Sequence, residues 1–153
     1  MNKLYRFSPI ISDEDLQKVW NYLTVELQKL SEKVLGEVLP VSILKVFPHY
    51  LDEYDYLYKT ISEKGPKSSF ASDKNLYVDV SEMIEGNKIT AIGVRIVDPY
   101  RMQVGCGDYE VDNFSEYREK HIKSPYVRDA KDSVEMLEIW HPDFDVLGYV
   151  IPR

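Results

Sequence analysis

Two apolar runs joined by a turn decide the fold: residues 76–97 read LYVDVSEMIEGNKITAIGVRIV. In residues 76–80, apolar side chains alternate with Tyr and Asp, which predicts a strand with one face turned inward. Residues 85–88 have the composition of a turn, and residues 89–97 form a second strand that the following Asp98-Pro99 ends. We therefore predict a hairpin, which would begin an antiparallel sheet.

A long helix is predicted before this hairpin. Ser12 is a residue type that is preferred at the N-cap of a helix. Three acidic residues follow it in the first turn, where the helix dipole favours negative charge. Apolar residues then recur at steps of three and four as far as Val34, and Gly36 supplies a C-terminal stop. We interpret the apolar stripe as the face that packs on the core, with a partner-binding helix as the alternative.

The remaining elements are shorter. We predict strands at residues 41–47, 102–111, 134–140 and 146–151, helices capped at Asp52 and at Asn113, and a loop over residues 123–132. Strands and helices neither alternate strictly nor segregate. This order favours the α+β class, with a mainly antiparallel curved sheet and helices on one face. We expect a single domain over residues 1–153, with a helical segment at 1–36 and two halves at 40–98 and 102–153.

Charge and cysteine content narrow the partners and the location. The chain of 153 residues has 26 acidic and 19 basic side chains, for a net charge of −7. Nucleic acids and anionic membranes bind clustered Lys and Arg, whereas the basic residues of this chain are outnumbered by acidic ones and interleaved with them. We therefore expect neither as a partner. The one cysteine, Cys106, fits a reducing cytosol. The N-terminus lacks the apolar core of a signal peptide, and we expect a cytoplasmic location.

The second half of the chain resembles a known structural module. The strand at 103–111, the helix at 114–122 and the segment 135–145 with its His-Pro-Asp-Phe turn resemble one module of the vicinal oxygen chelate superfamily. This superfamily contains glyoxalases and extradiol dioxygenases. The first half reads as a second such module. The resemblance implies two βαβββ modules that form a cupped sheet around a small ligand.

The same resemblance implies a divalent metal held by His, Glu or Gln on inward strand positions. The strand at 41–47 has no such side chain, since Lys45 is its only charged residue. The closing strand at 146–150 lacks the expected carboxylate, and Gln103 alone stands where a ligand often does. We therefore expect neither a metal site nor a cofactor. His141, Asp143 and Asp145 have the spacing of a metal loop, but ordinary turn chemistry is the alternative.

Polar residues within strand patterns are candidates for a binding site. Arg95 has apolar neighbours, and if its face is inside it must pair with a carboxylate, with Asp108 or Glu110 nearest. A buried arginine would anchor an anion; the alternative is a charge in solvent. Cys106 lies between two glycines, which would let a substrate approach the backbone. The alternative is a small buried strand residue.

Tyrosine is abundant, with 12 in the chain and four of them between residues 50 and 58. Helical spacing places Tyr54 and Tyr58 on one face, which suits a pocket rim or, alternatively, a helix packed on the sheet. These features predict a small-molecule-binding domain, with a pocket lined by Arg95, Cys106, Asp108, Tyr54, Tyr58 and Trp140.

Two other functions stay open. One is a glyoxalase-like or dioxygenase-like lyase or isomerase that uses a metal. The other is a protein-interaction module that dimerises through the tyrosine-rich helix or the long first helix. A homodimer is also compatible with a ligand-binding cup. The sequence does not decide whether the protein is an enzyme.

Overall fold

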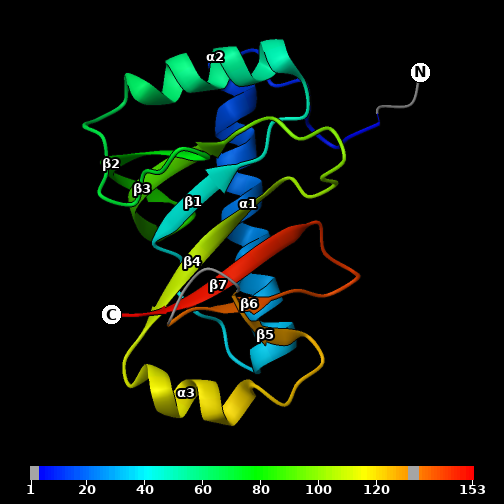
Figure 1. The fold of residues 1–153 in the computed structure, drawn as a ribbon, viewed down its shortest axis with the longest axis vertical. Coiled ribbons are helices and arrows are strands. Elements are labelled where there is room, and N and C mark those ends of the chain that lie inside the picture. Colours follow the sequence, from blue (N-terminus) through cyan, green and yellow to red (C-terminus); the bar gives the residue numbers. More distant parts are fainter. Residues whose placement is uncertain (1–3, 131–134) are drawn as a thin grey trace.

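The computed structural model describes residues 4–130 and 135–153, and these residues form three helices and one sheet of seven strands (Figure 1). The helices are α1 (Asp13–Leu35), α2 (Leu51–Ser62) and α3 (Phe114–His121). The strands are β1 (Ile43–Val46), β2 (Asn75–Ile84), β3 (Asn87–Arg95), β4 (Gly105–Val111), β5 (Val127–Asp129), β6 (Leu137–Ile139) and β7 (Val146–Pro152). Within the described residues, no helix combines the length and the apolar character needed to cross a membrane.

The sheet is mixed, with the strand order β2-β3-β1-β4-β7-β6-β5. The predicted hairpin, β2 and β3, is antiparallel as expected. However, β1 pairs in parallel with β3, and β4 pairs in parallel with β7. The α+β class is confirmed, whereas the mainly antiparallel sheet is only partly right. The reason is the return path of each half: a helix and β2 separate β1 from β3, and a helix with β5 and β6 separates β4 from β7, so the last strand of each half lies beside its first in the same direction.

The first helix ends where its caps predict. The Ser12 hydroxyl accepts a hydrogen bond from the backbone N–H of Asp15 at 3.1 Å, and Gly36 takes a left-handed φ of 82°. α1 crosses behind the sheet (Figure 1), and its buried residues join one core cluster with residues of α2, Phe114 of α3 and most strands. The apolar stripe therefore packs on the core, as predicted.

Two details differ from the sequence prediction. The expected loop at 123–132 contains β5, which pairs with β6; residues 131–134 lie outside the described residues. β5 has three residues and only Val127 is buried, so there was no alternation to detect. In α2 the N-cap is Tyr50 rather than Asp52, because the buried Glu53 carboxylate accepts the backbone N–H groups of His49 and Tyr50 at 2.7 and 3.3 Å.

Strand alternation sorts the side chains of the sheet into two faces. One face packs on α1. We call the other the open face, because no described helix crosses it (Figure 1). Its apolar members form two small clusters apart from the main core. By strand register the open face includes Ile43, Lys45, Tyr77, Ala91, Arg95, Cys106, Asp108, Leu147 and Tyr149, together with the more polar Asn75, Asp79, Glu110 and Glu138. Phe47, the residue after β1, packs on the same face against Cys106 and Leu147.

Candidate functional site

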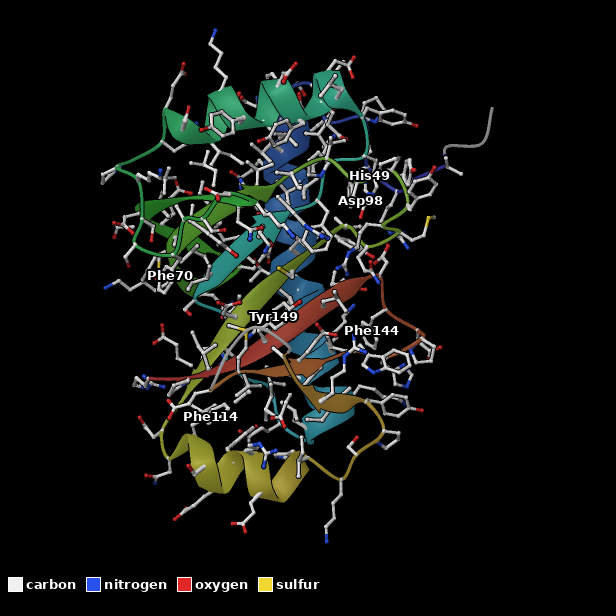
Figure 2. All side chains as sticks on the ribbon, in the orientation of Figure 1. His49, Phe70, Asp98, Phe114, Phe144 and Tyr149 are labelled. Carbon is white, nitrogen blue, oxygen red and sulfur yellow. The ribbon has the colours of Figure 1, made fainter. Side chains whose placement is uncertain are left out.

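The open face has an apolar floor around Phe47. Phe47, Cys106 and Leu147 are buried and contact one another, and Trp140 and Tyr149 pack against them. We call these five residues the Phe47 cluster. They come from β4, from β7 and from the residues that directly follow β1 and β6. Figure 2 labels Tyr149 near the centre of this face and Phe144 at its margin. The floor is thus assembled from strands that are far apart in the sequence.

Three cations gather at the ring of Phe47. The guanidinium carbons of Arg95 and Arg101 lie 5.6 and 5.7 Å from the ring centroid, and Lys45 Nζ lies 5.9 Å from it. These distances are within the range of cation–π attraction. Among the described residues, none of the three cations has a carboxylate within 4 Å. Lys45 Nζ donates a hydrogen bond to the neutral Asn75 side chain at 3.0 Å. The site is therefore locally positive in an acidic protein.

The position of Arg101 is set by the buried His49. The imidazole Nε2 of His49 is hydrogen-bonded to the backbone carbonyl of Arg101, so Nε2 carries the proton. Nδ1 then accepts from the Ser8 hydroxyl at 2.7 Å. The ring of Tyr5 stacks on His49 at 3.9 Å. Figure 2 shows His49 close to Asp98, in the segment that carries Arg101. These contacts hold that segment although it has no regular secondary structure.

A cavity of about 270 Å³ adjoins the Phe47 cluster. Its lining is half apolar and half polar: Trp140, Phe144, Val146 and Leu147, with Arg101, Gln103, Arg128 and His141. The charge of Arg128 is already paired, because its Nε donates to the Glu138 carboxylate at 2.8 Å. Arg101 is therefore the cation of this lining that has no carboxylate partner among the described residues. Arg101 is also one of the three cations at the Phe47 ring, so it belongs both to this group and to the lining of the cavity.

Two acidic groups of the open face, the Cys106 thiol and the Asp108 carboxyl, keep their protons to unusually high pH. Burial raises the pKa of the Cys106 thiol to about 11, which the nearby Lys45, Arg101 and Arg95 only partly offset. At neutral pH the thiol is protonated and is not a nucleophile. Burial also raises the pKa of Asp108 to about 7; Lys45 opposes this shift and Glu110 adds to it. Asp108 is thus the group of this face that changes charge near neutral pH.

The structure brings four of the six predicted site residues onto one face. Arg95, Cys106 and Trp140 contact or flank the Phe47 ring, and Asp108 follows two residues after Cys106 on β4. Tyr54 and Tyr58 lie elsewhere. They line a separate cavity of about 500 Å³ between α2 and residues 67–76.

The predicted set lacked the central ring, Phe47, and two of the three cations beside it, Lys45 and Arg101. Lys45 and Phe47 are two apart in a strand, so their shared face was a usable signal. Arg101 lies in an irregular segment, and no local pattern marks it.

Two sequence interpretations need correction. Arg95 has no carboxylate within 4 Å among the described residues, so the expected pair with Asp108 or Glu110 is wrong; Arg95 lies over Phe47 instead. The two glycines beside Cys106 face α1 and not a substrate. A Cβ on Gly107 would come within 2.5 Å of Leu27 Cδ1, so this glycine serves the close approach of the helix.

The candidate metal loop at His141 has other contacts. The Asp145 carboxylate accepts hydrogen bonds from Arg6 Nε at 2.8 Å and from the Tyr22 hydroxyl at 2.6 Å. His141 Nδ1 accepts from the backbone N–H of Asp143 at 3.1 Å. Over residues 4–130 and 135–153, no three His, Cys, Asp or Glu side chains converge in a way that would hold a metal ion.

Comparison with known proteins bears on the fold alone. Neither the known family models nor the curated proteins contain a match to this chain. One solved structure, described as "Structural Genomics, Protein EC4020", is similar with a TM-score of 0.66. The match covers 100% of this chain and 92% of that chain at 8% sequence identity. At so low an identity the similarity shows a shared fold, and the site must be interpreted from its own residues.

Proposed function

We propose that this protein binds a small organic molecule on the open face, in the cavity beside the Phe47 cluster. The observation that carries the proposal is the lining of this cavity. Apolar walls from Trp140 and Leu147 meet the Arg101 guanidinium, which has no carboxylate partner among the described residues. Apolar walls with a few convergent polar groups are typical of ligand pockets.

The size of the cavity limits the ligand. Its volume of about 270 Å³ lies just below the ~300–1,000 Å³ of pockets that take drug-sized molecules. The ligand is therefore expected to be smaller than a drug and to leave one end at the surface. The cavity lies where β6 and β7 diverge, so the rigid sheet supports its floor.

The strand pairing supports a two-module description of the cup. Each half places its last strand parallel to its first, and β1 and β4 meet as an antiparallel pair at the centre. The resemblance to the vicinal oxygen chelate superfamily stays a prediction. Our proposal needs only the side chains of this chain and assigns no reaction to them.

Nuclear magnetic resonance with a library of small organic acids, amides and alcohols tests the proposal. We expect some members to shift the indole N–H resonance of Trp140, which borders the cavity. The indole of Trp20 serves as the internal control, because Trp20 lies in α1 on its buried face and is only 4% exposed. A library in which no member moves Trp140, or in which every hit moves both indoles equally, would contradict the proposed function.

A further inference from the structure

We infer that the ligand of this cavity carries an anionic group, which Arg101 and Arg95 hold above the Phe47 ring with Lys45 beside them. This inference rests on the proposed function and adds to it the chemical class of the ligand. The anionic group would lie at the mouth of the cavity, and its carbon skeleton would lie against Trp140 and Leu147.

The argument begins with the uncompensated charge. Three side-chain cations lie within 6 Å of one ring centroid, and none has a carboxylate within 4 Å among the described residues. Because each cation lies within 6 Å of the same centroid, no two of them are more than 12 Å apart. Like charges at this range repel one another where partial burial weakens the screening by water. The ring face attracts each cation but carries no net charge, so the repulsion is relieved only in part. A bound anion would supply the negative charge that these side chains lack and would relieve more of the repulsion.

The protein has its own carboxylates, but among the described residues none lies within 4 Å of these cations; Asp108, on the same face, is near Lys45 without forming an ion pair with it. The chain has 26 acidic residues, so pairing would be easy to arrange. The exposed or rim arginines are indeed paired: Arg6 with Asp145, Arg118 with Asp129, and Arg128 with Glu138. Arg95 and Arg101 differ from these, although both are half-buried. Side chains held partly out of water without a counter-ion are suited to receive one from a ligand.

The placement of the cations also suits one anion. Arg95 comes from β3, Lys45 from β1, and Arg101 from the segment that His49 anchors. Three elements thus present donors around the Phe47 ring. Guanidinium groups offer paired N–H donors that match a carboxylate or a phosphate group. Because Arg101 also lines the cavity whose apolar wall is formed by Trp140 and Leu147, we expect a small organic acid rather than a bare inorganic anion.

The test compares ligands of equal shape and different charge. We would titrate the protein with benzoate and benzamide, with isobutyrate and isobutyramide, and with phenyl phosphate. The Trp140 indole reports binding in the cavity, and the Nε–H resonances of Arg95 and Arg101 report the anion. We expect each acid to bind about tenfold or more tightly than its amide, as charge-assisted hydrogen bonds would produce. If phenyl phosphate binds more tightly than benzoate, the ligand is assigned as a phosphate ester. If benzoate binds more tightly, the ligand is assigned as a carboxylic acid.

Variants locate the effect. Arg101→Gln and Arg95→Gln should each remove most of the preference for acid over amide. Arg118→Gln is the matched control, because it makes the same change in net charge at an exposed arginine paired with Asp129. Lys45→Met is a second test, should an arginine variant lose the fold by circular dichroism. Equal losses in Arg118→Gln and Arg101→Gln would show that only net charge matters, which contradicts the inference.

The outcomes separate this inference from the proposed function. If acids and amides shift Trp140 with equal affinity, the cavity binds ligands but the anionic class is wrong. If acids move the two arginine resonances and leave Trp140 unchanged, the anion site stands and the organic pocket fails. If no probe moves any of these signals, both proposals are overturned.

Discussion

On the face of the sheet toward α1, side chains are apolar, fully buried and closely packed; on the open face, the same strands carry Lys45, Arg95, Cys106 and Asp108. Successive side chains of a strand point alternately to the two faces. Each strand therefore contributes one set of residues to stability and the other set to the candidate site. We therefore expect substitutions on the α1 face to change the free energy of unfolding. Substitutions on the open face should chiefly change ligand binding or the dependence of stability on pH.

The largest effect is expected at Leu27, which is 0% exposed at the contact between α1 and β4. Leu27→Ala should lower the free energy of unfolding by about 3 kcal/mol, because it removes buried methyl groups and leaves a cavity. Urea denaturation followed by circular dichroism measures this loss. A loss below about 1 kcal/mol would mean that the α1 face is less well packed than its contacts indicate.

The next effect is at Asp108 and depends on pH. In the unfolded chain this carboxyl ionises near its ordinary pKa of 3.8, but in the folded protein burial raises the pKa to about 7. Between these pH values the folded protein holds a proton that the unfolded chain has lost, so stability falls as pH rises and stays lower above pH 7. The free energy of unfolding of Asp108→Asn should equal that of the natural protein below pH 4. At pH 9 it should be larger by about 2 kcal/mol.

Denaturation curves between pH 3 and pH 9 would measure this difference. Asp112→Asn is the control, because Asp112 is exposed and paired with Arg153. It should show no comparable gain at high pH. Parallel curves for Asp108→Asn and the natural protein would show that Asp108 ionises freely and belongs to the solvated part of the open face.

A smaller effect is expected at Tyr109, which is 0% exposed and donates its hydroxyl proton to the backbone carbonyl of Leu27. Tyr109→Phe removes this hydrogen bond and little else. The free energy of unfolding should fall by about 1 kcal/mol, the usual net contribution of a buried neutral hydrogen bond. An unchanged midpoint in urea would indicate that the helix and β4 do not need this contact.

The smallest effect is expected at Arg101 on the open face. Its guanidinium is half-buried and has no ion pair among the described residues. Arg101→Gln should change the free energy of unfolding by less than about 0.5 kcal/mol, while it removes the preference for anionic ligands. A large loss of stability would contradict the division between the two faces, since Arg101 would then support the fold.

The elements that could be predicted are those with local signals. The cap at Ser12, the stop at Gly36 and the turn of the hairpin each act within a few residues, and the structure contains all three. β5 had no such signal, because a three-residue edge strand with two exposed side chains is recognised only by its pairing with β6. The parallel pairings depend on which strands lie side by side, and alternation within a strand carries no information about that.

The candidate site divides in the same way. The sequence by itself determined that Arg95, Cys106, Asp108 and Trp140 fall within predicted strands, because residue type and alternation are visible in the order of residues. Only the tertiary structure decided that Arg95 and Arg101 converge on Phe47, and that Tyr54 and Tyr58 do not join them. The physical reason is that residues 47, 95 and 101 meet through strand order and through the His49 hydrogen bond. Both are contacts between distant parts of the chain, and neither has a local signature.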